Sequence, residues 1–267
     1  MIANPMERVS AWLAERAGFR TDGHRTDLLR SRLEPRLATF GLPTLEALAE
    51  ALEAGAHDEL ERAVLNAAAT NHTYFYREPE VLDALRTLVF PALEGRGPLR
   101  IWSAAASSGD EAYTVALMAI ERWGGAAAAA ANVAILGTDI ASVIATAEQG
   151  VYPVARVQAV PSDLRARYLE PVGLGLVRVR AEVRGLCTFR RLNLKSPEYP
   201  FARRMHVTLC RNVLYYFDLE TQRLVLERLH TYTEPGGFLF TSVTEPIRQL
   251  ETSWKPVAPG VFRSAHR

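Results

Sequence analysis

Three acidic residues follow predicted secondary-structure elements at positions where acids in α/β proteins bind ligands. Asp110 and Glu111 come directly after the loop 103–109, at the start of a predicted helix, and Asp139 ends the next predicted strand. In an open parallel sheet, an acid at the end of the second strand holds a ribose diol. Acids in a first helical turn stabilise the helix dipole, and they also suit a ligand that carries an ammonium group. The pattern therefore predicts a nucleoside-type ligand, with helix stabilisation and capping as the alternative roles.

The loop 103–109 lacks a phosphate-binding fingerprint. Gly109 is its only glycine, and alanines and serines fill the other positions, so there is no GxGxxG. The sequences GxxxxGK[ST] of P-loop proteins and GxSxG of hydrolases are also absent from the chain. Two acids beside a loop without phosphate-binding glycines favour a ligand with an adenosine, an ammonium group and no phosphates. S-adenosylmethionine (SAM) fits that description.

The histidines and cysteines predict neither a metal site nor a disulfide framework. The six histidines are scattered, and none lies at ligand spacing from another histidine or a cysteine. Cys187 and Cys210, the only two cysteines, stand among apolar residues of predicted strands, which is typical of inert core thiols. We therefore expect no metal.

The composition predicts a folded, cytoplasmic protein that does not bind nucleic acid. Of 267 residues, 48% are hydrophobic and 23% are charged, which excludes global disorder. The 31 Lys and Arg against 30 Asp and Glu leave a net charge of +1, whereas nucleic-acid binding normally requires a clear basic excess. No apolar segment approaches the roughly 20 residues that span a bilayer, and the first residues lack the order of a signal peptide.

The first 70 residues predict a small helical domain. Leu, Val and Ala recur there at helical spacing, and Gly18, Gly41 and Gly55 stand where helix ends favour a left-handed residue. Thr44 and Asp58 are the candidate N-caps of the third and fourth helices. The predicted helices cover residues 7–18, 26–41, 44–55 and 58–70.

Strands and helices alternate over residues 71–267, which predicts a mostly parallel, doubly wound sheet. At about residues 168–192 the alternation breaks, because LVRVRAEV (176–183) changes between apolar and polar in period two, as an exposed antiparallel strand does. We expect a small antiparallel β excursion there, outside the main sheet. The predicted strands cover residues 99–106, 132–140, 186–194, 205–213 and, as the last one, 238–244.

Five segments together resemble the CheR-type chemoreceptor methyltransferases. They are NHTYFYRE (71–78), WSAAASSGDEAYT (102–114), LGTDI (136–140), RRLNL (190–194) and CRNVLYYFD (210–218), in the order and spacing of that family. The resemblance covers nearly the whole chain, because the helical amino-terminal segment belongs to the family's architecture too. It implies an α/β fold with a Rossmann-like class I SAM-dependent methyltransferase domain over residues 71–267. It also implies an all-α, receptor-docking domain over residues 1–70.

The resemblance implies roles for individual residues. Glu111 matches the acid that meets the ammonium group of SAM, Asp139 the acid that holds the ribose, and Tyr216 the tyrosine near the transferred methyl group. We expect Arg77 and Tyr216 to orient the substrate carboxylate and to close the site. Asn193 and Leu194 match contacts around the adenine, although Asn193, like Thr73, has a turn or cap as its alternative role. The expected cofactor contacts are Asn71, Thr73, Arg77, Glu111, Asp139, Asn193, Leu194, Asn212 and Val213.

The implied reaction is methyl esterification of glutamate side chains on the cytoplasmic helices of a chemoreceptor, which leaves S-adenosylhomocysteine (SAH). The ordinary pKa of a glutamate side chain is about 4.3, so the substrate is ionised at pH 7 and needs no general base. Because these receptor helices are acidic, the resemblance favours a docking role, over a merely solvated face, for the arginines around the second predicted helix. The docking candidates are Arg25, Arg30, Arg32 and Arg36. We expect the protein to act as a monomer, without direct insertion into the membrane.

Two departures from the family pattern modify these expectations. The segment 167–180 is shorter than in members whose β excursion binds a carboxyl-terminal receptor pentapeptide, which predicts methylation without such a pentapeptide. The segment 241–246 (TSVTEP) lacks the Gly-His-Ser-Glu-like turn that is common in the family. Two other functions stay open. One is a methyltransferase of the same fold that acts on a small carboxylic acid, and the other is a non-catalytic module that senses the cofactor in a signalling pathway.

Overall fold

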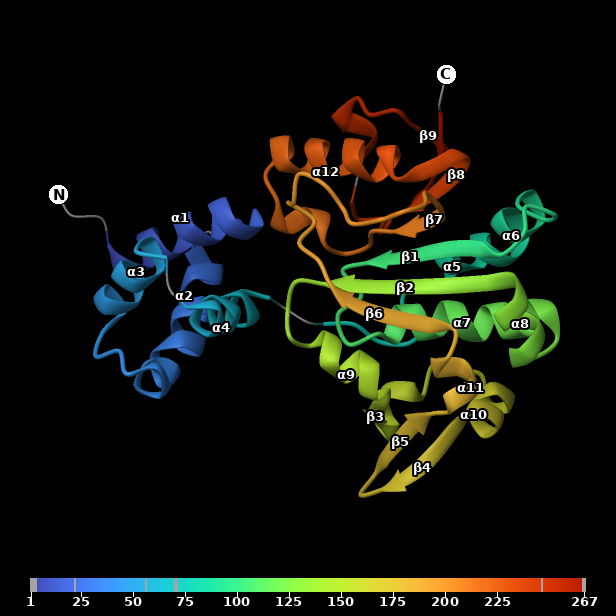
Figure 1. Ribbon diagram of the computed structural model, residues 1–267, viewed down its shortest axis with the longest axis horizontal. Coiled ribbons are helices and arrows are strands. Elements are labelled where there is room, and N and C mark those ends of the chain that lie inside the picture. Colours follow the sequence, from blue (N-terminus) through green and yellow to red (C-terminus); the bar gives the residue numbers. More distant parts are fainter. Residues whose placement is uncertain (1–3, 22, 56, 70–71, 246, 266–267) are drawn as a thin grey trace.

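The amino-terminal part of the chain is a bundle of short helices (blue in Figure 1). The computed structural model describes residues 4–21, 23–55, 57–69, 72–245 and 247–265. Val9 and Leu13 of the first helix pack with Leu48 and Val64 in the core of this bundle. Its helices are α1 (Pro5–Ala17), α2 (Gly23–Leu33), the 3₁₀ helix η1 (Glu34–Phe40), α3 (Leu45–Glu53) and α4 (Asp58–Ala68).

Local sequence explains where these helices begin and end. The side chain of Asn4 accepts a hydrogen bond from the N–H of Met6, and Glu7 completes a capping box at the start of α1. At its other end, Gly18 has a φ of 74°, a left-handed conformation that costs glycine little. Thr44 caps α3, as predicted, by accepting a hydrogen bond from the N–H of Ala47.

The structure corrects two details of the helical prediction. The second helix, predicted over 26–41, ends at Leu33 and continues as η1, because Pro35 has no N–H to donate within an α-helix. Arg36 therefore lies in η1 and not on α2. Asp58 is the first residue of α4 instead of its cap, since His57 occupies the cap position without a capping side-chain hydrogen bond.

A mostly parallel sheet forms the centre of the rest of the described chain, as the alternation of strands and helices predicted. Its strand order is β6-β2-β1-β7-β8-β10-β9. Strands β6, β2, β1, β7 and β8 run parallel, and β10 is antiparallel to both of its neighbours. The strands are β1 (Leu99–Ala104), β2 (Val133–Asp139), β6 (Cys187–Arg191), β7 (Met205–Leu209), β8 (Thr233–Phe240), β9 (Trp254–Ala258) and β10 (Val261–Ser264).

Helices cover both faces of this sheet (Figure 1). Along β1, Leu99 and Ile101 pack into the core beside α7, while Trp102 and Ala104 pack into the core beside α12. Successive side chains of a strand point to opposite faces, so β1 is apolar on both. The helices of this part are α5 (Pro79–Ala84), the π-helix η2 (Leu85–Val89), α6 (Phe90–Ala92), α7 (Asp110–Trp123), α8 (Ala126–Asn132), α9 (Ile144–Gln149), η3 (Val154–Val157), α10 (Ser162–Tyr168), α11 (Ala181–Arg184), η4 (Leu214–Tyr216), α12 (Leu219–Thr231) and η5 (Ile247–Leu250).

A small antiparallel sheet of β3 (Val151–Pro153), β5 (Leu176–Val179) and β4 (Leu169–Gly173) lies beside the main sheet (Figure 1). This confirms the antiparallel excursion but corrects its expected range of 168–192. β3 joins the small sheet from outside that range, and β6 pairs with β2 in the main sheet. The ring of Phe189 on β6 fits there because residue 137 is glycine, where a Cβ would lie 2.5 Å from the ring.

The segment predicted as the last strand is followed by two more. β9 and β10 form a hairpin at the sheet edge, with β10 paired to β8. Lys255, Pro256 and Val257 of β9 are exposed, so this edge strand lacks the buried alternation by which central strands are recognised. In the parts of the chain that the structure describes, no helix is long and apolar enough to cross a membrane.

Candidate active site

A pocket opens where β1, β2 and β7 end, on the side of the sheet that faces the helical bundle (Figure 1). Ala17 and Phe19 of the bundle contribute to its wall. Asn71, another predicted cofactor contact, lies outside the described residues. The predicted cofactor and catalytic residues that line the pocket are Thr73, Arg77, Glu111, Asp139, Asn193, Leu194, Asn212, Val213 and Tyr216.

The loop after β1 brings backbone close to the pocket. Ala105 and Ser107 have φ values of 69° and 51°, and Gly109 has a φ of 89°. A Cβ at Gly109 would lie 2.6 Å from the Cβ of Ala147 on α9, so only glycine fits there. The small residues of this loop therefore serve a tight turn that leaves space over the strand ends.

Asp110 is a structural residue, which resolves one of the alternatives for the acids of α7. Its buried carboxylate pairs with Arg156, whose Nε donates to Oδ1 over 2.6 Å. Arg156 also donates to the hydroxyl of Ser108 and to the carbonyl of Thr73. Arg156 thus joins the loop after β1 to the segment that carries Thr73 and Arg77. Sequence reasoning missed Arg156 because it lies in η3, 46 residues after its partner.

Glu111 lies on the wall of the pocket, held by two donors. The hydroxyl of Ser103, at the end of β1, donates to its Oε1 over 2.7 Å, and Nη1 of Arg211 donates to its Oε2 over 2.9 Å. The Glu111 side chain keeps 14% of its surface exposed, whereas that of Arg211 keeps 1%. Glu111 is therefore an oriented carboxylate at a place where a ligand ammonium group can reach it.

Asp139 ends β2 with its carboxylate almost fully buried. The N–H groups of Ser107 and Ala141 donate to its two oxygens over 2.8 and 2.9 Å. Burial raises the pKa of Asp139, and these two backbone hydrogen bonds oppose that rise by stabilising the ionised form. The geometry fits an acceptor for ribose hydroxyl groups, because each carboxylate oxygen has a second lone pair.

The segment 72–78 places Arg77 in the pocket wall. Its Nη1 donates to the carbonyl of His72 over 2.5 Å, and its guanidinium lies 5.8 Å from the ring centre of Tyr74. The hydroxyl of Thr114 on α7 accepts a hydrogen bond from the N–H of Tyr76. These contacts hold a partly exposed cation beside the pocket.

The turn after β7 is fixed by two acids that sequence reasoning missed. Asn212 has a φ of 58°, and its Nδ2 donates to Glu78 over 3.0 Å. The buried carboxylate of Glu245 accepts hydrogen bonds from the N–H groups of Asn212, Leu214 and Ser242. Burial raises the pKa of Glu245, and these backbone hydrogen bonds oppose the rise. Glu78 ends the NHTYFYRE motif, and Glu245 lies in segment 241–246, which departs from the family pattern. Nothing in the sequence indicates that both acids bind the same turn.

Asn193 and Leu194 line the pocket just after the end of β6, and Asn193 has an additional role. Its Nδ2 donates to the carbonyl of Arg16 at the end of α1, and its Oδ1 accepts a hydrogen bond from the N–H of Lys195. Lys195 donates to the carbonyls of Ala14 and Glu15 in the same helix. The amide of Asn193 thus forms a turn, the alternative that the sequence left open, and its contact with adenine stays a prediction.

Tyr216 joins the pocket to the helical bundle. Its ring meets that of Phe19 edge-on at 5.7 Å between centroids, and its carbonyl accepts a hydrogen bond from the N–H of Arg20 over 2.8 Å. The hydroxyl of Tyr215 donates to that of Tyr216 over 3.1 Å. The guanidinium of Arg25 lies 5.3 Å from the ring centre of Tyr216. The tyrosine therefore lies where a substrate held by the bundle would meet the pocket.

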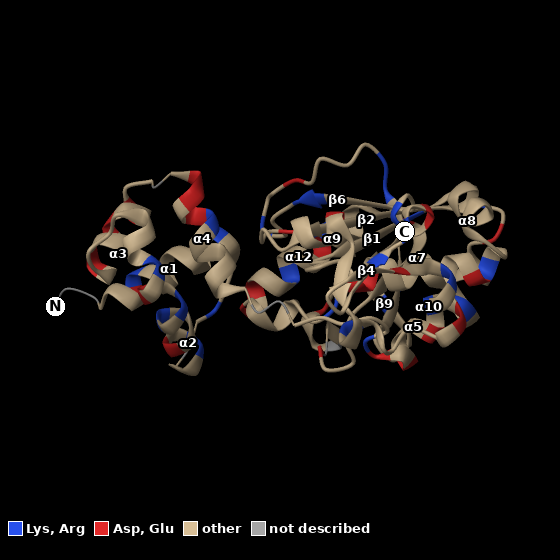
Figure 2. Cartoon of the chain, turned by 90° about the horizontal axis from the view of Figure 1, so that it is seen from below, with Lys and Arg blue, Asp and Glu red and all other residues tan. Residues whose placement is uncertain are grey.

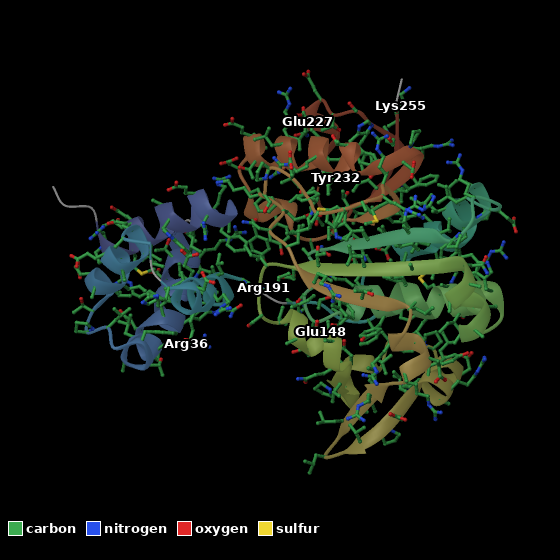
Figure 3. All side chains as sticks on the ribbon, viewed as in Figure 1. Arg36, Glu148, Arg191, Glu227, Tyr232 and Lys255 are labelled. Atoms are coloured by element: carbon green, nitrogen blue, oxygen red, sulfur yellow. The ribbon has the colours of Figure 1, made fainter. Side chains whose placement is uncertain are left out.

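The four predicted docking arginines differ in their surroundings. Arg36 is exposed at the lower edge of the bundle in Figure 3, and Arg30 is partly exposed. Arg32 instead donates to the carbonyls of Ala67 and Ala69, where it caps the end of α4. Acidic residues gather on α3 and at the start of α4, apart from α2 (Figure 2).

Within the described residues, neither the two cysteines nor any cluster of potential metal ligands indicates a second chemistry. Burial raises the pKa of Cys187 and of Cys210, so both thiols stay protonated near neutral pH. Among the residues with described placement, no three His, Cys, Asp or Glu side chains are grouped so that they could hold a metal ion.

Comparisons with known proteins match both parts of the chain. The family described as "CheR methyltransferase, SAM binding domain" matches residues 71–260, and "CheR methyltransferase, all-alpha domain" matches residues 4–67. A chemotaxis protein methyltransferase of Vibrio parahaemolyticus is 31% identical over 95% of this chain and 94% of its own. Chemotaxis protein methyltransferase 2 of Pseudomonas aeruginosa is 34% identical over 90% of this chain and 86% of its own. The structure of an O-methyltransferase family protein from Burkholderia thailandensis covers 90% of this chain and 60% of its own with a TM-score of 0.42 at 16% identity, too distant a likeness to support an argument.

Proposed function

This chain belongs to the CheR methyltransferase family, and on that premise we propose that it forms methyl esters on glutamate side chains of chemoreceptors, with SAM as the methyl donor. It is a SAM-dependent methyltransferase of the kind that methylates chemoreceptors. The single observation that carries the proposal is the pocket that gathers Arg77, Glu111 and Asp139 at the strand ends.

The residues of the pocket fit SAM. Glu111 offers an oriented carboxylate to an ammonium group, and Asp139 offers acceptors to a ribose. The tight turn at Ala105 and Ser107 leaves room for an adenosine, and this loop has no phosphate-binding glycines. Bound there, SAM supplies a sulfonium methyl group, which the glutamate carboxylate takes in an in-line displacement that leaves SAH.

The chain's own contribution is alignment and exclusion of water. Arg77, an expected cofactor contact, donates to the carboxylate of SAM and also attracts and orients the substrate carboxylate. The hydroxyl of Tyr216 fixes the second side of the substrate carboxylate. An anion and a cation lose charge as they meet in the transition state, so a site that excludes water favours the reaction. Phe19, buried against Tyr216, closes the pocket on the side of the helical bundle. No general base is required, since the nucleophile is already ionised.

Arg25, Arg30 and Arg36 form the docking face for an acidic receptor helix in this proposal. The position of Arg25 over the ring of Tyr216 supports it, because a helix bound there has its side chains next to the pocket. Arg32 is withdrawn from the docking set, because its guanidinium caps α4. Basic residues on such a face raise the rate of association with an acidic partner.

We further propose that methylation does not require a receptor pentapeptide. Supporting this, the small sheet is short: β4 has five residues and β5 has four, and only Leu174 and Gly175 connect them. A receptor fragment with its carboxyl-terminal tail removed tests the point. We expect equal methylation of intact and truncated fragments, and a strong loss on truncation would contradict this part of the proposal.

We also propose that the enzyme is a cytoplasmic monomer that does not bind nucleic acid, with SAM as its only cofactor and no metal. The near-neutral net charge of +1 supports the absence of nucleic-acid binding. Light scattering of the purified protein and activity in the presence of a chelator test these points. A dimer in solution, or a loss of activity that added metal restores, would contradict them.

The experiment that tests the proposed reaction uses methyl-labelled SAM and receptor-containing membranes from the protein's own source. The protein fraction is treated with base, and volatile methanol is counted. Base-labile label on a receptor-sized band is the expected result, since methyl esters hydrolyse in base. Binding of SAH by calorimetry without any base-labile label would contradict the reaction and favour a cofactor-sensing module. Label on added small carboxylic acids alone would favour the other alternative.

A further inference from the structure

Arg211 follows Cys210 after the end of β7. It is a buried cation that contacts two parts of the pocket wall, Glu111 on α7 and Arg77 in the segment 72–78. Its Nη1 donates to Oε2 of Glu111 over 2.9 Å, and its Nη2 donates to the carbonyl of Arg77 over 2.6 Å. Its Nη2 also lies 3.5 Å from Oε2 of Glu78. With 1% of its side chain exposed, the guanidinium makes these contacts away from solvent.

A buried ion pair stabilises a fold less well than its contacts suggest, because both charges lose their hydration. Removing charges from water costs free energy, and apolar side chains of similar volume are often at least as stable, so fold stability alone gives little reason for this cation. The contacts of Arg211 are directional instead. Together with the hydroxyl of Ser103, which donates to the other oxygen of Glu111 over 2.7 Å, they fix both oxygens of that carboxylate.

The amino-acid end of SAM carries an ammonium group and a carboxylate, so its recognition needs an acceptor and a donor at a set separation. In the proposed function, Glu111 is the acceptor and Arg77 is the donor. Arg211 bonds to the side chain of the first and to the backbone of the second, and it is the described residue that does both. A shift of Arg211 would therefore change the position of both groups at once.

We propose that Arg211, supported by Ser103, is a positioning residue for the amino-acid end of SAM. It acts through Glu111 and through the backbone of Arg77. The proposal rests on the proposed function, because that function assigns Glu111 and Arg77 to this end of the cofactor. Adenosine recognition by Asp139 is independent of Arg211, since Asp139 is held by the N–H groups of Ser107 and Ala141.

The test compares two ligands that differ only at the amino-acid end. SAH carries the ammonium and carboxylate groups, and 5′-methylthioadenosine lacks both. Calorimetry with the full chain measures both dissociation constants for wild type, Arg211→Lys and Ser103→Ala. Lysine keeps the positive charge but lacks the two guanidinium nitrogens that donate to two separate acceptors. We expect Arg211→Lys to weaken SAH by about 10-fold or more, as for loss of a charge-assisted hydrogen bond, and methylthioadenosine by less than about twofold.

Each outcome separates this inference from the proposed function. Wild-type protein that does not bind SAH contradicts the proposed function itself. Equal weakening of both ligands, or no weakening of SAH, overturns the positioning role while leaving the proposed function intact. If Arg211→Lys does not fold, as judged by its thermal transition, Ser103→Ala decides. If Ser103→Ala weakens the binding of SAH but not of methylthioadenosine, the positioning of Glu111 is supported. Unchanged SAH binding in Ser103→Ala overturns the proposal.

Discussion

The guanidinium of Arg77 is oriented by the protein and forms only a long ion pair with Glu78. It donates to the carbonyl of His72 and lies 3.9 Å from Oε1 of Glu78, a carboxylate that Asn212 and Ser242 also engage. A cation held in this way can attract a substrate carboxylate without the tight ion pair that would blunt the nucleophile. The residue is therefore suited to alignment, which is the main demand of an in-line displacement.

Replacing Arg77 tests that role. In Arg77→Ala we expect kcat to fall by about 100-fold, the size of the loss when one preorganised electrostatic contact is removed. Initial rates at saturating receptor measure it. Arg122→Ala is the matched control, because Arg122 pairs with Glu94 at the surface and does not line the pocket. Wild-type turnover in Arg77→Ala would refute the assigned role.

Ionisation of Glu78 makes the stability of the fold depend on pH. Burial raises the pKa of its carboxyl group, but the hydrogen bond from Asn212, the charge of Arg211 and the hydroxyl of Ser242 together outweigh burial and lower the pKa. A lowered carboxyl pKa stabilises the fold above the ordinary value of about 4.3, and that contribution is lost as the pH falls through the folded-state pKa.

The Tm of Glu78→Gln should accordingly fall less steeply than that of wild type from about pH 6 to about pH 3. Thermal melts at several pH values measure the two slopes. Glu227→Gln, which removes an exposed partner of Arg223 on α12, should keep the wild-type slope. Identical slopes for Glu78→Gln and wild type would contradict the stabilising role of the ionised Glu78.

Residues at the ends of strands can be predicted from sequence, whereas their partners cannot. Asp139 at the end of β2 and Glu111 in the helical turn after the β1 loop are found because topology places strand ends and the loops after them at one edge of the sheet. Arg211 and Asp110's partner Arg156 are missed, because Arg211 is 100 residues from Glu111 and Arg156 is 46 from Asp110. Only the packed tertiary structure brings such groups within hydrogen-bond distance.

At the scale of elements, the turn after β7 depends on one buried carboxylate. The two oxygens of Glu245 accept hydrogen bonds from the backbone of Asn212, Leu214 and Ser242. In Glu245→Gln, one acceptor becomes an NH₂ donor that faces a backbone N–H. We expect a loss of about 1–3 kcal/mol in the free energy of unfolding, the cost of an unsatisfied buried group. Denaturant unfolding measures it, and no loss would contradict this account of the turn.

The proposed docking face belongs to α2 and η1. Reversing two of its charges in Arg30→Glu/Arg36→Glu should raise the receptor KM by about 10-fold and reduce its dependence on salt, with kcat unchanged at saturation. Arg203→Glu is the control, because Arg203 is exposed in the loop before β7, at the other end of that strand from the pocket. A receptor KM that does not change in the double variant would rule out docking through this face.

Element boundaries show what a pattern of residues can and cannot specify. The second helix ends before its predicted end because Pro35 interrupts the hydrogen bonds, although the apolar spacing continues. β6 belongs to the main sheet because it pairs with β2, with Phe189 packed against Gly137, a contact between distant segments. Local periodicity finds the elements, but pairing across the sheet decides where each one belongs.

For the whole molecule, the helical bundle is fastened to the pocket itself. Lys195 and Asn193 bind the last carbonyls of α1, where a cation also complements the helix dipole, and the N–H of Arg20 donates to the carbonyl of Tyr216. The proposed adenosine wall is thereby bonded to the domain that we propose docks the receptor. Both parts follow from the sequence through the family resemblance, whereas their attachment through Lys195 appears only in the structure.

In the proposed reaction, glutamate carboxylates of a receptor take the methyl group in this pocket. The most direct measurement maps methyl groups, by peptide mass spectrometry, on a purified receptor cytoplasmic fragment incubated with SAM and the enzyme. We expect base-labile methyl esters on glutamates of the receptor helices, and their near absence with Arg77→Ala. Methyl groups on other side-chain types, or a receptor left unmodified by an enzyme that binds SAH, would contradict it.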